Sequence, residues 1–217
     1  MIELINVIKK YQYHGKTINV LSNVNLKINK GECVCLAMPS GAGKTTLLNI
    51  IGGMVASSSG SVRINSTDIT RLPQHFLAAY RLKKIGFIFQ QFNLLPHYTV
   101  MENLYFPLIP AGKQLHAERK RIETLLDRLK ISHRADFHVN LLSGGEQQRA
   151  AVVRALINNP EIIIADEPFS NLDPENTAFI LEIFKELKNE GKTFIISTTT
   201  TLMKQANGFI DREITRW

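Results

Sequence analysis

Residues 34–48 read VCLAMPSGAGKTTLL, and this stretch decides the fold of the chain. A short apolar run ends at Ala37, a loop of small residues follows, and Lys44 opens a second apolar run. This order predicts a buried strand, a phosphate-binding loop and a helix, because glycines let backbone N–H groups turn toward an anion at the positive end of a helix. In such a loop Lys44 supplies charge for the β and γ phosphates, and Thr45 supplies a hydroxyl for Mg²⁺.

The loop departs from the full phosphate-loop pattern at one position, since G-x-x-x-x-G-K-[ST] has glycine where Met38 stands. The word Gly-Lys-Thr also occurs at residues 15–17 and 191–193. The first copy lies in a polar turn, and the second follows a helix pattern, where glycine is a common C-cap. Only residues 43–45 lie between a strand and a helix, although an ordinary glycine-rich turn remains the alternative for this loop alone.

The composition suits a folded α/β protein without a nucleic-acid partner. A chain of 217 residues is long enough for one large domain, or a core with a smaller lobe, that buries about 70% of its unfolded surface. The net charge of +7 is dispersed, and the basic clusters at 81–84 and 119–121 lack interleaved aromatic residues. We favour a solvated basic face over a membrane-apposed surface, and both over nucleic-acid binding.

The sequence predicts a soluble protein with reduced cysteines. Cys33 and Cys35 alternate along the predicted strand, so their side chains point to one face, which suits thiols in a cytoplasmic core. Their spacing is not the C-x-x-C of a redox or zinc site. The most apolar runs, such as residues 162–165, are too short to cross a bilayer, and the first residues lack the regions of a signal peptide.

Alternating apolar patterns at residues 2–8 and 18–28 predict antiparallel strands at the N-terminus. Tyr11 and Tyr13 are expected in the connection between these strands. An exposed tyrosine ahead of a nucleotide-binding loop can stack on a base, and the alternative is that one or both of these tyrosines pack against the sheet. For Tyr13 we expect packing against the sheet.

Polar side chains follow two further predicted strands at the point where each strand ends. Residues 85–89 form a buried-strand pattern that ends at Gln90. Residues 162–165 form another, which ends at Asp166 and Glu167. Open α/β sheets bind ligands along this edge, so Gln90 can reach a metal or its water, Asp166 can hold Mg²⁺, and Glu167 can align an attacking water. The alternative for Gln90 is a surface glutamine without a role, and the alternative for Asp166 and Glu167 is a pair of solvated charges. The phosphate loop earlier in the chain argues against solvated charges.

A second anion site is predicted at residues 143–145, where Ser-Gly-Gly enters a helix pattern. Free backbone N–H donors, a hydroxyl and a helix N-terminus can bind an anion here, as in the first loop. Another helix is expected after Asp173, which caps it, with Pro174 at its first position. Residues 92–110 hold three prolines among apolar residues, so this stretch is expected to cover or dock something.

Residues 142–149 read LSGGEQQR, the signature word of the ATP-binding cassette family. Together with the phosphate loop, Gln90 and the two acids, this word makes the chain resemble the nucleotide-binding subunits of ABC transporters over essentially its whole length. The resemblance implies a single ABC ATPase domain over residues 1–217. This α/β fold is a P-loop NTPase RecA-like core with an antiparallel β subdomain and a helical signature subdomain at about 92–158.

The resemblance also implies a role for each site residue. The catalytic residues are Glu167, Gln90 and Thr199, and the Mg²⁺ ligands are Thr45, Gln90 and Asp166. The residues that bind ATP are Tyr11, Pro39, Ser40, Gly41, Ala42, Gly43, Lys44, Thr45, Thr46, Ser143, Gly144, Gly145, Glu146 and Asp173. Thr199 stands where the family normally has a histidine that contacts the γ-phosphate, and threonine carries no positive charge. We therefore expect slower ATP hydrolysis.

The partners implied by the resemblance are a second copy of the chain and a membrane protein. Two copies close head to tail, so that Ser143 and Gly145 of one contact the γ-phosphate held by Lys44 of the other. An integral membrane subunit docks near residues 90–106. Three short stretches, at residues 89–96, 99–103 and 171–173, resemble the sequences of one branch of the family. This branch includes the lipoprotein-releasing, macrolide-exporter and cell-division cassettes.

These implications lead to one expected function and one alternative. The expected function is an ATP-hydrolysing subunit that energises a membrane ABC transporter, an exporter or a lipoprotein- or peptide-extruding system. It is expected to be peripheral, at the cytoplasmic face of the inner membrane. The alternative is a slowly hydrolysing regulatory or mechanotransmitting ATP switch that controls an envelope process, and Thr199 keeps it open. A cassette that acts on nucleic acid is disfavoured, because such proteins typically carry two cassettes or a long coiled-coil insertion.

Overall fold

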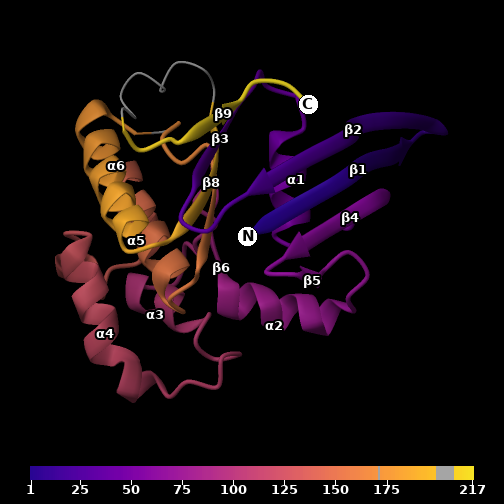
Figure 1. The fold of residues 1–217 in the computed structure, drawn as a ribbon. Helices are drawn as coiled ribbons and strands as arrows, with labels where there is room; N and C mark the ends of the chain where they lie inside the picture. Colours follow the sequence, from indigo (N-terminus) through magenta and orange to yellow (C-terminus); the bar gives the residue numbers. More distant parts are fainter. Residues whose placement is uncertain (171, 199–207) are drawn as a thin grey trace.

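The computed structural model describes residues 1–170, 172–198 and 208–217, which are arranged around two β-sheets (Figure 1). The first sheet is antiparallel, with the strand order β2-β1-β4-β5. Its strands are β1 (Ile2–Tyr13), β2 (Lys16–Ile28), β4 (Ser59–Ile64) and β5 (Thr67–Asp68). The predicted N-terminal strands are confirmed, and they are longer than expected because their pairing continues to the hairpin turn.

The long hairpin corrects the expected position of two tyrosines. Tyr11 and Tyr13 lie within β1, where both pair with residues of β2, and not in a connection between strands. His14 and Gly15 form the turn with φ values of 46° and 73°, the left-handed geometry that matches the twist of a two-residue hairpin. Tyr13 is 64% exposed and contacts the His14 ring edge-on, so the expectation that it packs against the sheet is wrong.

The second sheet is parallel, with the strand order β6-β7-β8-β3-β9. Its strands are β3 (Cys33–Ala37), β6 (Ile85–Ile88), β7 (Ile162–Asp166), β8 (Thr193–Thr198) and β9 (Arg212–Ile214). Strands β3 and β7 lie on either side of β8, with Ala37 opposite Thr198 and Asp166 opposite Ser197. The phosphate loop and the two acids therefore leave the sheet at the same edge.

Helices cover both faces of the parallel sheet (Figure 1). The α-helices of the described residues are α1 (Lys44–Ile51), α2 (Gln74–Lys84), α3 (Val100–Tyr105), α4 (Leu115–Arg128), α5 (Gly144–Leu156) and α6 (Pro174–Asn189). In Figure 1, α5 and α6 lie on one side of this sheet, and α1 lies on the other side, toward the antiparallel sheet. Phe194 and Ile196 pack in the core on the first side and Ile195 in the core on the second. Burial on both faces explains why the strands read as continuous apolar runs.

Cys33 and Cys35 are buried in β3 and form no disulfide. Cys33 packs in the same core as Phe194 and Phe209. Burial raises the pKa of both thiols, that of Cys35 to about 12, so both are protonated at neutral pH. The two cysteines therefore act as small core residues, in line with the expected reduced thiols.

Helices α3 and α4 pack against α5 and form a helical lobe. The Thr99 hydroxyl caps α3 by accepting a hydrogen bond from the Glu102 N–H, and the Glu102 carboxylate accepts one from the Thr99 N–H at 2.7 Å. This capping box fixes the start of α3. The lobe boundaries at 92–158 and the single domain over 1–217 stay predictions. In the described part of the chain, every helix is too short or too polar to span a lipid bilayer.

Candidate functional site

Two glycines in the loop between β3 and α1 have left-handed backbone geometry, Gly41 (φ 81°) and Gly43 (φ 88°). A Cβ at Gly43 would lie 2.9 Å from both the Val20 carbonyl oxygen and Leu21 Cδ2, so this backbone packs directly against β2. A Cβ at Gly41 would meet nothing within 4 Å. The loop is thus closed at Gly43 and open at Gly41, where an anion can approach the backbone N–H groups.

We expect Gly43→Ala to destabilise the protein more than Gly41→Ala does. Both alanines must adopt a left-handed conformation, which costs about 1–2 kcal/mol. Only at position 43 does the new methyl group also clash with the backbone of β2. Chemical denaturation of both variants measures the two free energies of unfolding, and equal losses would contradict the packing that we assign to Gly43.

Met38 occupies the position where the phosphate-loop pattern has glycine, and the structure explains why methionine fits. Its backbone is not among those with positive φ, so glycine is not required there. The side chain is 2% exposed and belongs to the apolar core around α1. Only the carbonyl oxygen turns to the loop, where it accepts a hydrogen bond from Lys44 Nζ at 2.7 Å. Position 38 therefore contributes to the loop through its backbone.

Lys44 is the first residue of α1 and is 6% exposed. Its Nζ donates to the carbonyl oxygens of Met38 at 2.7 Å and Pro39 at 3.2 Å. The same atom lies 3.4 Å from Glu167 Oε1. A buried ammonium needs such partners, because removing a charge from water without compensation is costly. These contacts hold one positive charge inside the loop.

Asp166 and Glu167 follow one another at the end of β7, and Ser197 on β8 orients both. Asp166 Oδ1 accepts a hydrogen bond from the Ser197 hydroxyl. The Glu167 N–H donates to the Ser197 carbonyl oxygen at 3.1 Å and to its hydroxyl oxygen at 3.0 Å. These bonds hold Glu167 at a left-handed φ of 48°, which costs about 1–2 kcal/mol for a residue with a side chain. The carboxylate of Glu167 contacts Lys44, whereas the carboxylate of Asp166 contacts Ser197 on β8.

One pocket of about 430 Å³ collects residues from the loop, α1 and the strand ends. Its lining residues are Val20, Ser40, Gly41, Gly43, Lys44, Thr45, Thr46, Gln90, Glu167 and Ser170. The volume is in the range of about 300–1,000 Å³ typical of small-molecule sites. The Ser170 hydroxyl donates to the Glu167 carbonyl oxygen at 3.0 Å and so supports the turn after β7.

Trp217 contacts the phosphate loop from the segment that follows β9. Its indole Nε1–H donates to the Ala42 carbonyl oxygen at 2.6 Å. Strand β9 pairs with β3, the strand that leads into the loop, and so carries this segment to the site. No sequence pattern signals the contact, because it joins residues 175 positions apart.

The pocket offers oxygen ligands suited to Mg²⁺. The side chains of Thr45 and Gln90 both line it, and both residues are exposed. Magnesium commonly takes one or two protein oxygens together with substrate phosphates and water. Asp166 is not part of the lining, and its carboxylate accepts a hydrogen bond from the Ser197 hydroxyl. The residues present therefore fit a magnesium nucleotide, and the roles of Thr45 and Gln90 as metal ligands and of Asp166 through water stay predictions.

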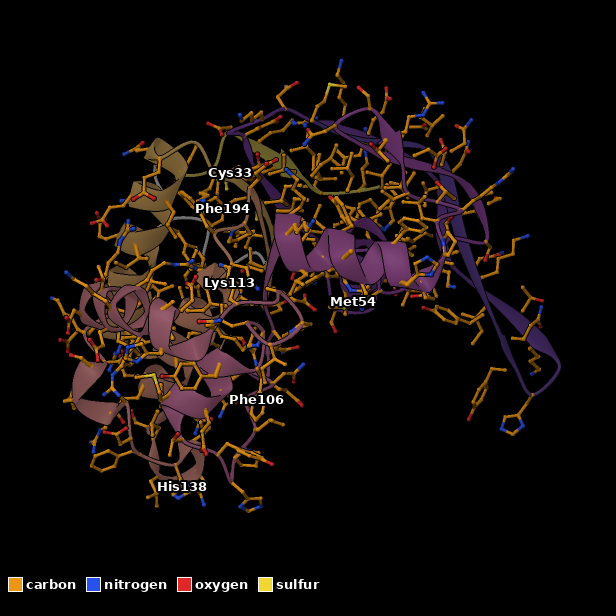
Figure 2. The ribbon with its side chains drawn as sticks, turned by 90° about the horizontal axis from the view of Figure 1, so that it is seen from below. Cys33, Met54, Phe106, Lys113, His138 and Phe194 are labelled. Atoms are coloured by element: carbon orange, nitrogen blue, oxygen red, sulfur yellow. The ribbon has the colours of Figure 1, made fainter. Side chains whose placement is uncertain are left out.

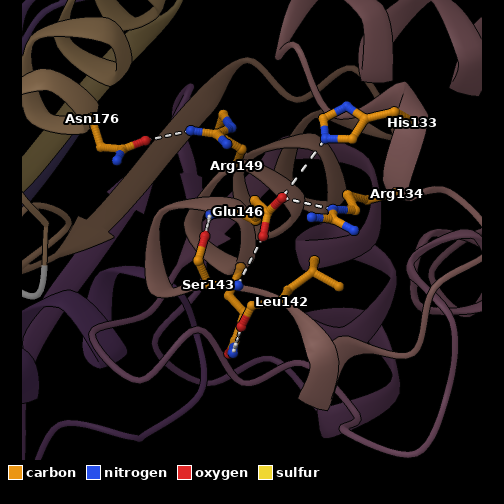
Figure 3. Close-up of polar contacts among 8 residues, drawn as sticks. His133, Arg134, Leu142, Ser143, Glu146, Arg149 and Asn176 are labelled. Carbon is orange, nitrogen blue, oxygen red and sulfur yellow. Dashed lines mark hydrogen bonds and ion pairs between the residues drawn. The ribbon is translucent and has the colours of Figure 1, made fainter.

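The predicted second anion site, residues 143–145, begins α5 and is closely capped (Figure 3). The Ser143 hydroxyl accepts a hydrogen bond from the Glu146 N–H at 3.3 Å, and Glu146 Oε2 accepts one from the Ser143 N–H at 2.8 Å. Glu146 Oε1 accepts from Arg134 Nε at 2.7 Å. The Glu146 carboxylate thus shapes the loop within its own chain, and its contact with ATP stays a prediction.

The pKa of Glu146 gives this cap a measurable pH dependence. Burial raises the pKa, but hydrogen bonds from Arg134 and Ser143 outweigh burial and lower the pKa to about 2. Since the unfolded pKa is about 4.3, the carboxylate contributes stability above that pH, and the contribution is lost as the pH falls toward 2. We expect Glu146→Gln to be less stable than the parent near neutral pH, with a difference that shrinks below about pH 4.3. Denaturant titrations across this range check it, and a constant difference would contradict an ionic origin.

The start of α5 is joined to the start of α6. A Cβ at Gly145 would lie 2.6 Å from the Asn176 side chain, so this close approach requires glycine. Arg149 donates to Asn176 Oδ1, and Asp173 accepts hydrogen bonds from the Asn176 N–H at 2.7 Å and from its side-chain amide at 2.6 Å. Asp173 is therefore the N-cap of α6, as predicted. Its contact with ATP stays a prediction.

The structure does not bring all the predicted site residues into one pocket. Residues 143–145, Tyr11 and Asp173 are outside the lining described above. Tyr11 is 40% exposed on β1, with Lys9 Nζ 4.7 Å from the centroid of its ring. Thr199 lies outside the described residues.

The parallel sheet, the glycine loop before α1 and the acids at a neighbouring strand end define the class of P-loop nucleotide-binding proteins. The chain belongs to the ABC transporter family, whose model matches residues 21–170. Among solved structures, the chain is similar to a dimeric post-hydrolysis state of the ATP-binding cassette MJ0796 bound to ADP and Pi. The TM-score is 0.92 at 40% identity, over 100% of this chain and 94% of that one. The predicted fold and family are thereby confirmed.

Two similar proteins indicate the branch of the family to which the chain belongs. The lipoprotein-releasing system ATP-binding protein LolD of Bacteroides fragilis (strain YCH46) is 41% identical over 199 residues, 91% of this chain and 90% of LolD. The macrolide export ATP-binding/permease protein MacB 1 of Yersinia pestis bv. Antiqua (strain Antiqua) is 39% identical over 212 residues, 97% of this chain and 33% of MacB 1. The chain thus spans about a third of the length of this macrolide-export relative.

Proposed function

We propose that the chain is the ATP-hydrolysing subunit of a membrane export system similar to the lipoprotein-releasing or macrolide-export systems. The observation that carries the proposal is the single pocket lined by the phosphate loop, Lys44, Gln90 and Glu167. Phosphoryl transfer to water needs a loop that holds the phosphates, a positive charge, a metal ligand and a group that orients the water. This pocket supplies one of each.

The ion pair between Lys44 and Glu167 suggests how the pocket becomes active. When Mg²⁺ and ATP are bound, they supply the phosphoryl group and part of the neutralising charge. Lys44 Nζ, now 3.4 Å from Glu167 Oε1, turns to the phosphate oxygens, and this releases the Glu167 carboxylate to accept a hydrogen bond from water. The bonds from Ser197 keep Glu167 in position meanwhile.

The site is completed by a second copy of the chain. Residues 143–145 provide a hydroxyl and a helix N-terminus, yet they do not line the pocket of their own chain. A head-to-tail dimer places them over the phosphate loop of the partner copy, where the helix N-terminus favours a negative charge. The similar MJ0796 cassette is described as dimeric in two solved structures.

Ser143→Arg, made in a Glu167→Gln background, tests the shared site. The arginine blocks the interface but leaves the pocket of its own chain intact, so we expect loss of the ATP-dependent dimer, while the ATP affinity measured at protein concentrations where the parent is monomeric stays unchanged. Size-exclusion chromatography with ATP measures the dimer, and Ser22→Arg on the exposed face of β2 is the control. A dimer that persists in the Ser143 variant, or a fall in the ATP affinity of its monomer, would contradict head-to-tail sharing.

The membrane subunit docks near residues 90–106, and the chain is peripheral at the cytoplasmic face of the inner membrane. Large apolar side chains are exposed in this stretch, notably Leu95, Tyr98 and Phe106, and the last two rings contact each other edge-on at 5.1 Å. Exposed apolar groups that gather on a surface mark interaction sites. Co-purification of an integral membrane subunit from membranes tests this docking, and movement of lipoproteins, peptides or macrolides by the reconstituted complex tests the substrate class.

Slow turnover is the second candidate, and only the sequence at Thr199 favours it. A hydroxyl there cannot supply the positive charge of histidine next to the γ-phosphate. We therefore expect Thr199→His to raise the rate of ATP hydrolysis by the complex with its membrane subunit. Steady-state kinetics measures this, and an unchanged or lower rate means that Thr199 does not limit catalysis.

A further inference from the structure

The segment after β9, residues 215–217, brings Trp217 to the outer side of the phosphate loop. Strand β9 is the edge strand of the parallel sheet and pairs with β3, with Ile214 opposite Leu36. Parallel strands rise by nearly the same distance per residue, so three residues further on one chain segment has reached Pro39 and the other Trp217. Figure 1 shows this segment leaving β9 toward the side of the sheet on which α1 lies.

Strand β3 gives this contact a fixed frame. It lies between β8 and β9, and its first residue, Cys33, lies opposite Phe194 of β8 in the buried core (Figure 2). All five residues of β3 are buried. Because parallel pairing sets both neighbours of β3, the register of the sheet places Trp217 beside the loop.

The hydrogen bond from Trp217 sets the direction of one peptide group in the loop. The indole Nε1–H donates to the Ala42 carbonyl oxygen at 2.6 Å. The peptide bond between Ala42 and Gly43 is trans, and in a planar trans peptide the C=O and N–H groups point in opposite directions. Gly43 lines the nucleotide pocket, whereas Trp217 does not. With the carbonyl held on the side of Trp217, the Gly43 N–H is directed at the pocket.

The other donors around the loop serve other carbonyl groups. Lys44 Nζ donates to the two carbonyl oxygens at the start of the loop. The hydrogen bonds of α1 begin at Gly43, whose carbonyl oxygen accepts from the Leu47 N–H at 2.9 Å. Among the described residues, Trp217 is therefore the donor that holds the Ala42 carbonyl. This orientation matters for an anion, because backbone N–H groups attract it and carbonyl oxygens repel it.

The exposure of Trp217 favours a directional role over a packing role. Trp217 is 36% exposed, whereas Phe209, which precedes β9, is 1% exposed and belongs to the core. A ring that stays open to water gains less free energy from apolar burial than a core ring does. An indole N–H that is partly shielded from water usually finds an acceptor, and here the acceptor belongs to the phosphate loop.

We propose that Trp217 is a positioning residue for phosphate binding. Its N–H turns the Ala42 carbonyl out of the nucleotide pocket and thereby presents the Gly43 N–H to a phosphate group of the bound nucleotide. The loop is then arranged before the nucleotide arrives, so less of the binding free energy is lost in ordering it. This inference goes beyond the proposed function, because it concerns nucleotide binding by the chain itself and needs no membrane subunit.

Replacement of one ring tests this hydrogen bond. Trp217 is the only tryptophan of the chain, so growth with 3-benzothienylalanine in place of tryptophan changes this residue alone. The new ring keeps the shape of indole but has sulfur in place of the N–H donor. We expect the affinities for ATP and for tripolyphosphate, an anion without a base, to fall by the same factor. That factor is about threefold to tenfold, the effect of one hydrogen bond.

Isothermal titration calorimetry, at protein concentrations where the parent is monomeric, measures both affinities. Trp217→Phe, which also removes the donor, should shift them in the same direction. Thr215→Ala changes an exposed residue of the same segment and should bind both ligands like the parent. Thermal unfolding of each protein separates an effect on the loop from an effect on folding, and we expect the ring replacement to leave the unfolding temperature unchanged.

The outcomes separate this inference from the proposed function. If the parent binds neither ATP nor tripolyphosphate, the proposed function fails. If the parent binds both and the ring replacement changes neither affinity, the inference is overturned while the proposed function stands. A loss for ATP alone also overturns it, because the ring then acts on the base. A loss of affinity matched by a lower unfolding temperature overturns it as well, since the ring then acts on folding.

Discussion

Replacing Lys44 with alanine is expected to weaken ATP binding by about 10–100-fold, because hydrogen bonds from a charged donor contribute about 1.5–3 kcal/mol. The Lys44 ammonium is a charged donor in the lining of the pocket, and Lys44 is almost fully buried. Its loss also leaves the Glu167 carboxylate, now 3.4 Å away, without its partner and facing the phosphates. Equilibrium titration with a fluorescent ATP analogue measures the change in affinity.

Lys192→Ala is the matched control for this variant. Lys192 stands in another Gly-Lys-Thr word and also donates to oxygens of the main chain and side chains, those of Pro160 at 2.7 Å and Asn159 at 2.5 Å. It precedes β8, at the end of the sheet opposite to the phosphate loop. Its removal should leave ATP affinity unchanged. A similar loss in both variants, or in neither, would show that we have misassigned the phosphate-binding lysine.

Glu167→Gln is expected to slow ATP hydrolysis by about 10²–10⁴-fold, the contribution typical of a general base. The amide is nearly the same size as the carboxylate, and the hydrogen bonds to Ser197 come from the backbone of residue 167, so the position of the side chain is retained. ATP binding should therefore persist, and an ATP-bound dimer should accumulate. Phosphate release and size-exclusion chromatography measure the two effects.

Glu161→Gln controls for the loss of one carboxylate near β7. Glu161 precedes this strand at its other end and pairs with Lys84 at the surface. An exposed pair contributes about 0–1 kcal/mol, so hydrolysis should match the parent. Parent-like turnover in the Glu167 variant would exclude Glu167 as the base.

The parts of the site that lie within short stretches of sequence were predictable. The phosphate loop, the acids after β7 and the cap of α6 each depend on a few adjacent residues, whose conformational preferences and hydrogen bonds are local. The structure agrees with the sequence at these places, because Asp173 caps α6 and the loop joins β3 to α1. Local patterns also separate residues 43–45 from the other two Gly-Lys-Thr words.

Contacts between distant residues could not be predicted. Ser197 orients both acids only because β7 and β8 pair in one particular register. Trp217 reaches Ala42, and Arg154 reaches the turn at Phe92, across gaps in sequence that no periodicity spans. The expected position of Tyr13 was wrong for a related reason, since the length of a hairpin depends on cross-strand pairing as well as on the pattern of each strand.

The sequence by itself determined the family, the phosphate loop, the order of strands and helices around it and the identity of the acids, because these follow from local chemistry and from an eight-residue signature word. The tertiary structure alone decided three further points. It showed why Met38 is tolerated, since that side chain turns into a core made by other elements. It showed that the Glu146 carboxylate is occupied within its own chain. It also showed that Arg154 of α5 donates a hydrogen bond to the carbonyl oxygen of Phe92, in the turn after Gln90. Each depends on which side chains meet after folding.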